Sequence, residues 1–148
     1  MKINLPVINE EVAVPEGEVI ISITNTKGVI SYINQSFEDI SGFTKEELLG
    51  KSHNIVRHPD MPPEAFDDLW KTLKAGKPWL GLVKNRCKNG SYYWVEAYVS
   101  PNYESGELTG YQSVRVKPNP ADCGRASKYY QHRQKVTRLP SLRTRNSR

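Results

Sequence analysis

The sequence predicts an α+β fold, a five-stranded antiparallel sheet with short helices packed over one face. Strand-like, β-branched segments occur first as a pair and then, after a helical section, as three consecutive strands. The helical section carries helix start and stop signals and one stretch with the spacing of an amphipathic helix. Helices gathered over one face of such a sheet bury its apolar side chains and leave a hollow between the two layers.

The first half of the chain predicts a hairpin followed by short helices. The β-branched segments 19–24 and 29–34 flank turn-forming residues, which is typical of two paired strands. A helix is expected over 36–40. Thr44 and Glu47 then have the spacing of a capping box, which predicts the start of a second helix.

A third, longer helix is predicted after a loop over 51–62. Pro62-Pro63-Glu64 suits a first helical turn, and Gly76 suits the residue just past the end. Four apolar residues between them fall at i, i+3, i+4 and i+7 and define one helix face: Phe66, Leu69, Trp70 and Leu73.

The second half predicts three strands in sequence, at 79–87, 91–100 and 108–116. Lys88-Asn89-Gly90 supplies a hairpin turn between the first two, and a loop over 101–107 is predicted before the third. A short polar helix is possible over 121–136.

Composition favours one small domain. A chain of 148 residues can bury a core without disulfides, and 25% charged with 37% hydrophobic residues is typical of a soluble globular protein. Cys87 and Cys123 are too few for a disulfide scaffold, which indicates reduced thiols and a cytoplasmic location. Residues 1–18 lack the apolar stretch of a signal peptide, and no segment predicts a membrane span.

Charge divides the chain unevenly. Residues 1–116 hold 12 Lys/Arg against 15 Asp/Glu, whereas residues 117–148 hold 9 Lys/Arg and one acid. We therefore expect an N-terminal cap at 1–16, a domain at 17–116, and a basic, largely disordered or linker tail at 117–148. The tail could contact nucleic acid, an anionic membrane or an acidic partner, but it shows no recognised motif, and no specific nucleic acid is expected.

Several specific strings match one known family. They are Ser41-Gly42-Phe43-Thr44, His53-Asn54-Ile55-Val56-Arg57-His58-Pro59-Asp60-Met61-Pro62, Lys77-Pro78-Trp79, Val83-Lys84-Asn85-Arg86, Tyr93-Trp94-Val95 and Gly110-Tyr111. With the order of elements, these strings resemble the PAS domains of bacterial aerotaxis receptors and related chemoreceptors. The likeness runs from about residue 17 to Val116, and the 53–62 string is its most specific part.

The resemblance implies that FAD is held non-covalently in the hollow. It implies a redox or oxygen sensor for aerotaxis or chemotaxis, with a chemotaxis signalling domain or protein as partner and a second PAS copy in a homodimer. The family normally continues into a membrane anchor and a long helical signalling domain, neither of which is recognisable here. We therefore expect a fragment or a stand-alone variant.

With the resemblance, eight residues are expected to contact the cofactor: Asn34, Arg57, His58, Asp60, Phe66, Trp70, Trp79 and Asn85. The planar fork of Arg57 suits a diphosphate, although the residue could instead be solvated or paired with Asp60. His58 could bond the cofactor, lock the loop or bind a metal. Asp60 is expected to cap the helix start or to orient His58.

Each aromatic and amide residue among these candidates can be interpreted either as a cofactor contact or as a structural residue. Phe66, Trp70 and Trp79 could stack on a flavin ring or belong to the plain core. Asn34 and Asn85 lie on predicted strands, where they could bond the flavin or pin a loop or bulge. Of Tyr93 and Trp94, one faces the hollow and the other faces outward, and the sequence leaves open which.

Two other functions compete with the flavin hypothesis. A haem gas sensor would use His53 or His58 as its axial ligand, and a cofactor-free module would serve only for dimerisation or docking. No serine triad, paired catalytic acids or glycine-rich phosphate loop occurs, so neither an enzyme nor a resident metal ion is expected. Cys87 lies beside a turn, and a photochemical adduct with flavin is not expected.

Overall fold

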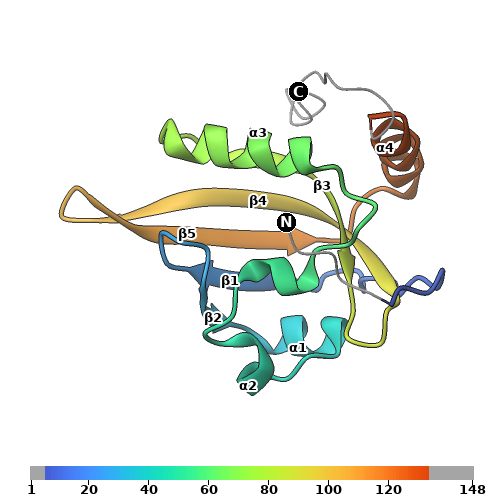
Figure 1. Cartoon of the computed structure of the whole chain (residues 1–148). Coiled ribbons are helices and arrows are strands. Elements are labelled where there is room, and N and C mark those ends of the chain that lie inside the picture. The colour runs from blue at the N-terminus through green and yellow to red at the C-terminus, as the bar shows by residue number, and fades with distance from the viewer. Residues whose placement is uncertain (1–5, 134–148) are drawn as a thin grey trace.

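The computed structural model describes residues 6–133 (Figure 1). Its centre is one antiparallel sheet with the strand order β2-β1-β5-β4-β3. The strands are β1 (Ile20–Thr24), β2 (Ile30–Ile33), β3 (Trp79–Arg86), β4 (Tyr92–Glu104) and β5 (Glu107–Val116). The N-terminal hairpin joins the C-terminal meander through the pairing of β1 with β5. The predicted fold class is therefore confirmed.

Four helical segments connect β2 to β3. They are α1 (Gln35–Ser41), α2 (Lys45–Leu48), the 3-10 helix η1 (His53–Val56) and α3 (Pro63–Lys74). Figure 1 shows α3 running alongside β4, with α1 and α2 near β2. Phe37, Leu48, Val56 and Leu73 anchor these segments in the core and are almost completely buried. Their burial fixes the helical layer over one face of the sheet.

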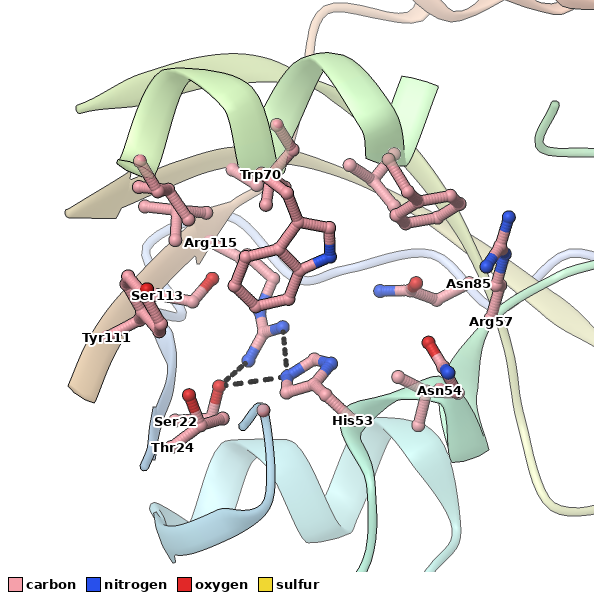
Figure 2. Close-up of a pocket in the computed structure, with 18 of the residues that line it drawn as sticks. Ser22, Thr24, His53, Asn54, Arg57, Trp70, Asn85, Tyr111, Ser113 and Arg115 are labelled. Carbon is pink, nitrogen blue, oxygen red and sulfur yellow. Dashed lines mark hydrogen bonds between the residues drawn. The ribbon is translucent and has the colours of Figure 1, made fainter. Parts of the chain in front are cut away.

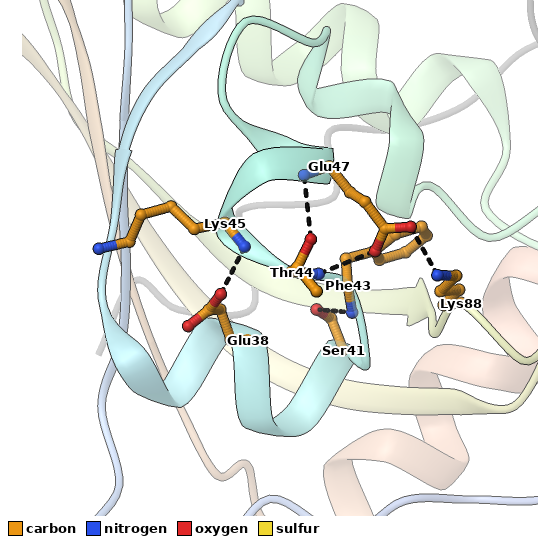
Figure 3. A network of polar contacts seen from close by, with 7 residues as sticks. All are labelled: Glu38, Ser41, Phe43, Thr44, Lys45, Glu47 and Lys88. Carbon is orange, nitrogen blue, oxygen red and sulfur yellow. Dashed lines mark hydrogen bonds and ion pairs between the residues drawn. The ribbon is translucent and has the colours of Figure 1, made fainter.

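The capping box predicted at Thr44 and Glu47 is present (Figure 3). The amide of Glu47 donates to Oγ1 of Thr44 at 3.2 Å, and the amide of Thr44 donates to Oε1 of Glu47 at 2.9 Å. Oε2 of Glu47 also pairs with Nζ of Lys88 at 2.5 Å, which lowers the pKa of the carboxyl. Because Lys88 lies in the turn after β3, the pair ties the start of α2 to the β3–β4 hairpin.

The loop predicted over 51–62 contains η1 and is fixed to the sheet at both ends. Oγ of Ser52 accepts from the amide of Asn54 at 3.2 Å and so caps η1. Before the 3-10 helix, Ser52 forms an isolated bridge with Val29; after it, Arg57 forms one with Asn85. These bridges hold the segment from His53 to Arg57 over the sheet.

The prediction of a loop over 101–107 is wrong. β4 continues to Glu104, and only Ser105 and Gly106 make the turn to β5, with φ of 51° and 81°. Positive φ at both central residues is the conformation that joins two strands through a two-residue hairpin. Pro101 is tolerated in β4 because the pairing with β3 ends at Trp79 and Val99, which leaves that edge without a partner strand.

The outer face of the sheet is partly covered by α4 (Pro120–Arg133), within the segment expected to be a linker tail. The hydroxyl of Tyr130 donates to the carbonyl of Leu82 at 2.7 Å. Its ring stacks on Trp94, with 6.3 Å between centroids and 13° between planes. Trp94 therefore faces outward, and Tyr93 faces the helical layer. Residues 134–148, the rest of the expected tail, lie outside the described part.

The N-terminal segment runs beside the start of β4. The amide of Ile8 donates to the carbonyl of Gly90 at 2.8 Å, and that of Val12 to the carbonyl of Tyr92 at 2.7 Å. Val14 is buried in the core, so the segment covers part of the domain. None of the helices within residues 6–133 has the length and apolar character needed to cross a membrane.

Candidate functional site

A pocket lies between the helical layer and the inner face of the sheet (Figure 2). It encloses about 750 Å³ of space between atoms, part of which is open to solvent. Strand side chains that alternate along β3, β4 and β5 face it, together with residues of β1, η1 and α3. The walls are largely apolar: Val56, Leu69, Leu73, Val83, Ala97 and Val99.

Three polar side chains meet on one side of this pocket (Figure 2). Nη2 of Arg115 donates to Oγ of Ser22 at 2.7 Å, and Nη1 lies 3.1 Å from Nε2 of His53. Oγ of Ser22 is also 3.1 Å from that ring nitrogen. The three residues come from β5, β1 and η1, so they link the 3-10 helix to two adjacent strands of the sheet.

The charge of this cluster follows from burial. Burial and the nearby charge of Arg115 lower the pKa of His53 to about 3, so the imidazole is neutral at neutral pH. Burial also lowers the pKa of Arg115, to about 10, so the guanidinium keeps its charge. Arg115 takes part in none of the ion pairs found among residues 6–133, and its Nε is buried without a hydrogen-bond partner.

Aromatic side chains also line the pocket. The ring of Trp70 meets that of Tyr111 edge to face, with 5.2 Å between centroids. The guanidinium carbon of Arg57 lies 3.9 Å from the centre of the Phe66 ring, in cation–π geometry. Asn85 is buried and also lines the pocket. The pocket thus offers flat apolar surface, an amide and a buried positive charge.

The structure brings together four of the eight predicted site residues. Arg57, Phe66, Trp70 and Asn85 line the pocket. The other four, Asn34, His58, Asp60 and Trp79, do not line it, and their side chains have other roles.

Asn34 joins β1 to α1. Its Oδ1 accepts from the amides of Ile21 at 3.0 Å and Phe37 at 3.3 Å, and its Nδ2 donates to the carbonyl of Val19 at 2.7 Å. This residue is the N-cap of α1. These bonds fit the interpretation that Asn34 pins a junction, and the residue does not line the pocket.

His58 and Asp60 hold the segment that precedes α3. The amide of Asp60 donates to Nδ1 of His58 at 3.0 Å, and the His58 ring is buried. Burial, with Lys84 nearby, lowers the pKa of His58 to about 4. The Asp60 carboxylate pairs with Lys84 at 2.7 Å instead of capping α3, whose N-cap is Pro62 without a side-chain bond. The backbone amide of Asp60 orients the histidine, and the Asp60 carboxylate also lies 3.8 Å from Nδ1 of that ring.

Trp79 is core. Its ring is almost fully buried, and its Nε1 donates to Oδ2 of Asp68 in α3 at 2.9 Å. This contact locks α3 to the first residue of β3, beyond the lining of the pocket.

Sequence reasoning missed Ser22 and Arg115, and it considered His53 only as a haem ligand. A signal for Arg115 was present, because it alternates with Tyr111 and Ser113 along one face of a strand. A charged residue on the inward face of a strand is unusual unless a partner or ligand meets it. Within residues 6–133, no three His, Cys, Asp or Glu side chains gather closely enough to hold a metal ion.

Comparison with known proteins places these features in context. Residues 30–115 match the family model described as PAS fold. The aerotaxis receptor of Escherichia coli (strain K12) is 44% identical over 111 residues, which is 75% of this chain and 22% of that protein. The chain thus spans about a fifth of that relative.

Solved structures share the fold at lower identity. A PAS domain from Colwellia psychrerythraea has a TM-score of 0.62 at 22% identity, covering 68% of this chain and 86% of that one. The dark structure of the blue-light photoreceptor Aureochrome1 LOV has a TM-score of 0.64 at 20% identity, covering 78% of this chain and 84% of that one.

Proposed function

Because this chain belongs to the PAS-fold family, we propose that it is a sensor domain that binds a flavin, FAD, non-covalently in the pocket. The domain acts by binding and reporting rather than by transforming a substrate. A bound flavin would supply reversible redox chemistry, so the reported quantity is redox state or oxygen. The similarity to an aerotaxis receptor supports this assignment.

The observation that carries the proposal is that the pocket combines flat aromatic surface with buried polar groups. A flavin ring is flat and apolar over its faces and polar along one edge, so it needs aromatic surface and a few polar partners. Trp70 provides the aromatic surface, while Asn85 and Arg115 provide buried polar groups.

Arg57 is the proposed contact for the diphosphate of FAD. Its backbone is fixed to β3 by the bridge with Asn85, and its side chain rests on Phe66. A guanidinium held in this way presents a planar fork to phosphate oxygens. His58 and Asp60 support Arg57 indirectly, because they hold the backbone that follows it.

The signal is proposed to pass through the sheet. Alternate residues of β3, β4 and β5 face the pocket, and their neighbours face outward, so a change at the ligand shifts both faces. The partners we propose are a chemotaxis signalling domain or protein and a second copy of this domain. The thiols of Cys87 and Cys123 are free, which suits a cytoplasmic location.

Haem is less well supported than flavin. An axial ligand needs a ring nitrogen that points into the pocket and is open to the metal. Nε2 of His53 is taken up by Ser22 and Arg115, and a cation beside it disfavours a second one. Nδ1 of His58 accepts from the amide of Asp60, and the ring is buried outside the pocket lining.

The absorbance spectrum of the purified chain tests the proposal. We expect a flavin spectrum, FAD released on denaturation, and uptake of FAD by the apo form. Trp70→Ala should lower the retained flavin several-fold, whereas Tyr32→Ala, which removes an exposed aromatic outside the pocket, should retain it. A folded wild-type chain that neither contains nor takes up flavin would contradict the proposal and favour a cofactor-free docking module.

A further inference from the structure

Arg115 is held in place without being neutralised. An arginine side chain has donors and no acceptor, so Nε2 of His53 must accept from Nη1, while Oγ of Ser22 accepts from Nη2. Both acceptors are neutral groups. The guanidinium is almost fully buried, with an exposed fraction of 3%, and a third donor, Nε, has no partner.

Burying the Arg115 guanidinium in this way costs folding free energy unless another group supplies a negative charge beside it. A buried charge without a counter-ion is strongly disfavoured, and native proteins almost always pair it or bring a ligand to it. The Phe37 ring lies 4.9 Å from the Arg115 guanidinium carbon, and this cation–π contact offsets part of the cost without supplying negative charge. Since Arg115 lines the pocket, the ligand itself can supply this negative charge.

We propose that Arg115 makes the pocket selective for the negatively charged, reduced state of its ligand, with Ser22 and His53 as the positioning residues. The inference rests on the proposed flavin function and names the residue that sets its redox potential. A flavin ring that takes up two electrons and one proton from an external reductant becomes an anion. A fixed cation beside the ring stabilises that anion relative to the neutral, oxidised ring.

The midpoint potential of the flavin-loaded chain is the direct test. Arg115→Gln removes the charge and keeps polar atoms, and Arg115→Lys keeps the charge without the fork. We expect Arg115→Gln to reduce the preference for reduced over oxidised flavin at least tenfold, about 30 mV lower for a two-electron couple. Arg115→Lys should recover part of this difference.

A matched control separates the local charge from net charge. Lys88→Gln removes one positive charge from the surface, where Lys88 pairs with Glu47 outside the pocket lining. Its midpoint potential should equal that of the wild type. Equal potentials in Arg115→Gln and in the wild type would overturn the inference, as would an equal shift in Lys88→Gln.

A second measurement needs no substitution at Arg115, which matters if the variants do not fold. The wild-type apo chain is loaded with a flavin analogue whose ring carries an ionisable hydroxyl. We expect the pKa of the bound analogue to fall by at least one unit relative to the free analogue, because Arg115 favours the ring anion. A bound pKa that is unchanged or raised would contradict the inference.

The two proposals fail in different ways. A wild-type chain that takes up no flavin contradicts the proposed function, and this inference with it. Uptake of flavin by the wild type, with a potential that does not respond to Arg115→Gln or an analogue pKa that does not fall, contradicts the role of Arg115 alone.

Discussion

The indole of Trp79 lies directly over Gly81, two residues further along β3. A Cβ built on Gly81 would lie 2.4 Å from Cη2 of the ring, well inside van der Waals contact. The ring is held there by its bond to Asp68, which ties β3 to α3 at one end of the pocket. Gly81 is thus required by packing against Trp79 and not by its own backbone conformation.

Gly81→Ala should lower the free energy of unfolding by about 1–3 kcal/mol, because a methyl group forced against a fully packed ring moves the ring or the strand. Urea denaturation measures the difference. Gly124→Ala is the control, since a Cβ at Gly124 in α4 meets nothing within 4 Å. That substitution should leave the stability unchanged or raise it by less than about 1 kcal/mol. Equal stability of Gly81→Ala and the wild type would contradict the packing argument.

Asn34 and Asn85 should separate stability from flavin binding. Asn34→Ala removes three bonds to backbone groups at the β1–α1 junction and should cost about 1–3 kcal/mol of stability. Its folded fraction should bind FAD with wild-type affinity. Asn85→Ala should instead weaken FAD binding about tenfold, because it removes a polar group from the pocket.

Urea denaturation and a flavin titration on both variants give this comparison. Weak flavin binding by fully folded Asn34→Ala would contradict this prediction and show that Asn34 contributes to flavin binding.

Acid should destabilise the domain through His53. The ordinary histidine pKa is 6.5 and that of His53 is about 3, so between these values the unfolded chain binds a proton that the folded chain does not. Stability is therefore full above pH 6.5 and falls as the pH drops, by up to about 1.4 kcal/mol per pH unit for this one group.

His53→Gln should flatten the slope of stability against pH between pH 6 and 4, whatever its stability at pH 7. The free energy of unfolding measured across that interval provides the check. All other titrating groups are common to both chains, so parallel slopes would show that His53 accepts a proton in the folded state.

The Tyr130 hydroxyl should control how firmly α4 is attached. Tyr130→Phe removes the bond to the Leu82 carbonyl while keeping the ring on Trp94, at a cost of about 0.5–1.5 kcal/mol. Amide hydrogen exchange in α4 should accelerate several-fold. Tyr98→Phe removes a hydroxyl from a largely exposed ring and should leave this exchange unchanged. Protection of α4 that is the same in both variants would show that the hydroxyl contributes nothing.

Short-range spacing determined much of the fold from the sequence. The hairpin of β1 and β2, the capping box at Thr44 and Glu47, and the apolar face of α3 all depend on residues a few positions apart. The expected loop over 101–107 failed because the Pro101 signal is local. Whether a proline interrupts a strand depends on which edge of that strand has a neighbour, and only the sheet order decides this.

The sequence by itself determined the order of elements, the family resemblance and four of the pocket residues. These features depend on backbone preferences and on the spacing of residues that are close together in the chain. The tertiary structure alone decided that Tyr93 faces inward and Trp94 outward, since alternation along a strand does not say which face is covered. It also decided the environment of Arg115, whose bond to Ser22 joins residues 93 positions apart. Alternation along β5 indicates which face Arg115 shares, but the burial of its charge and the identity of its partners depend on side chains that other elements pack around it.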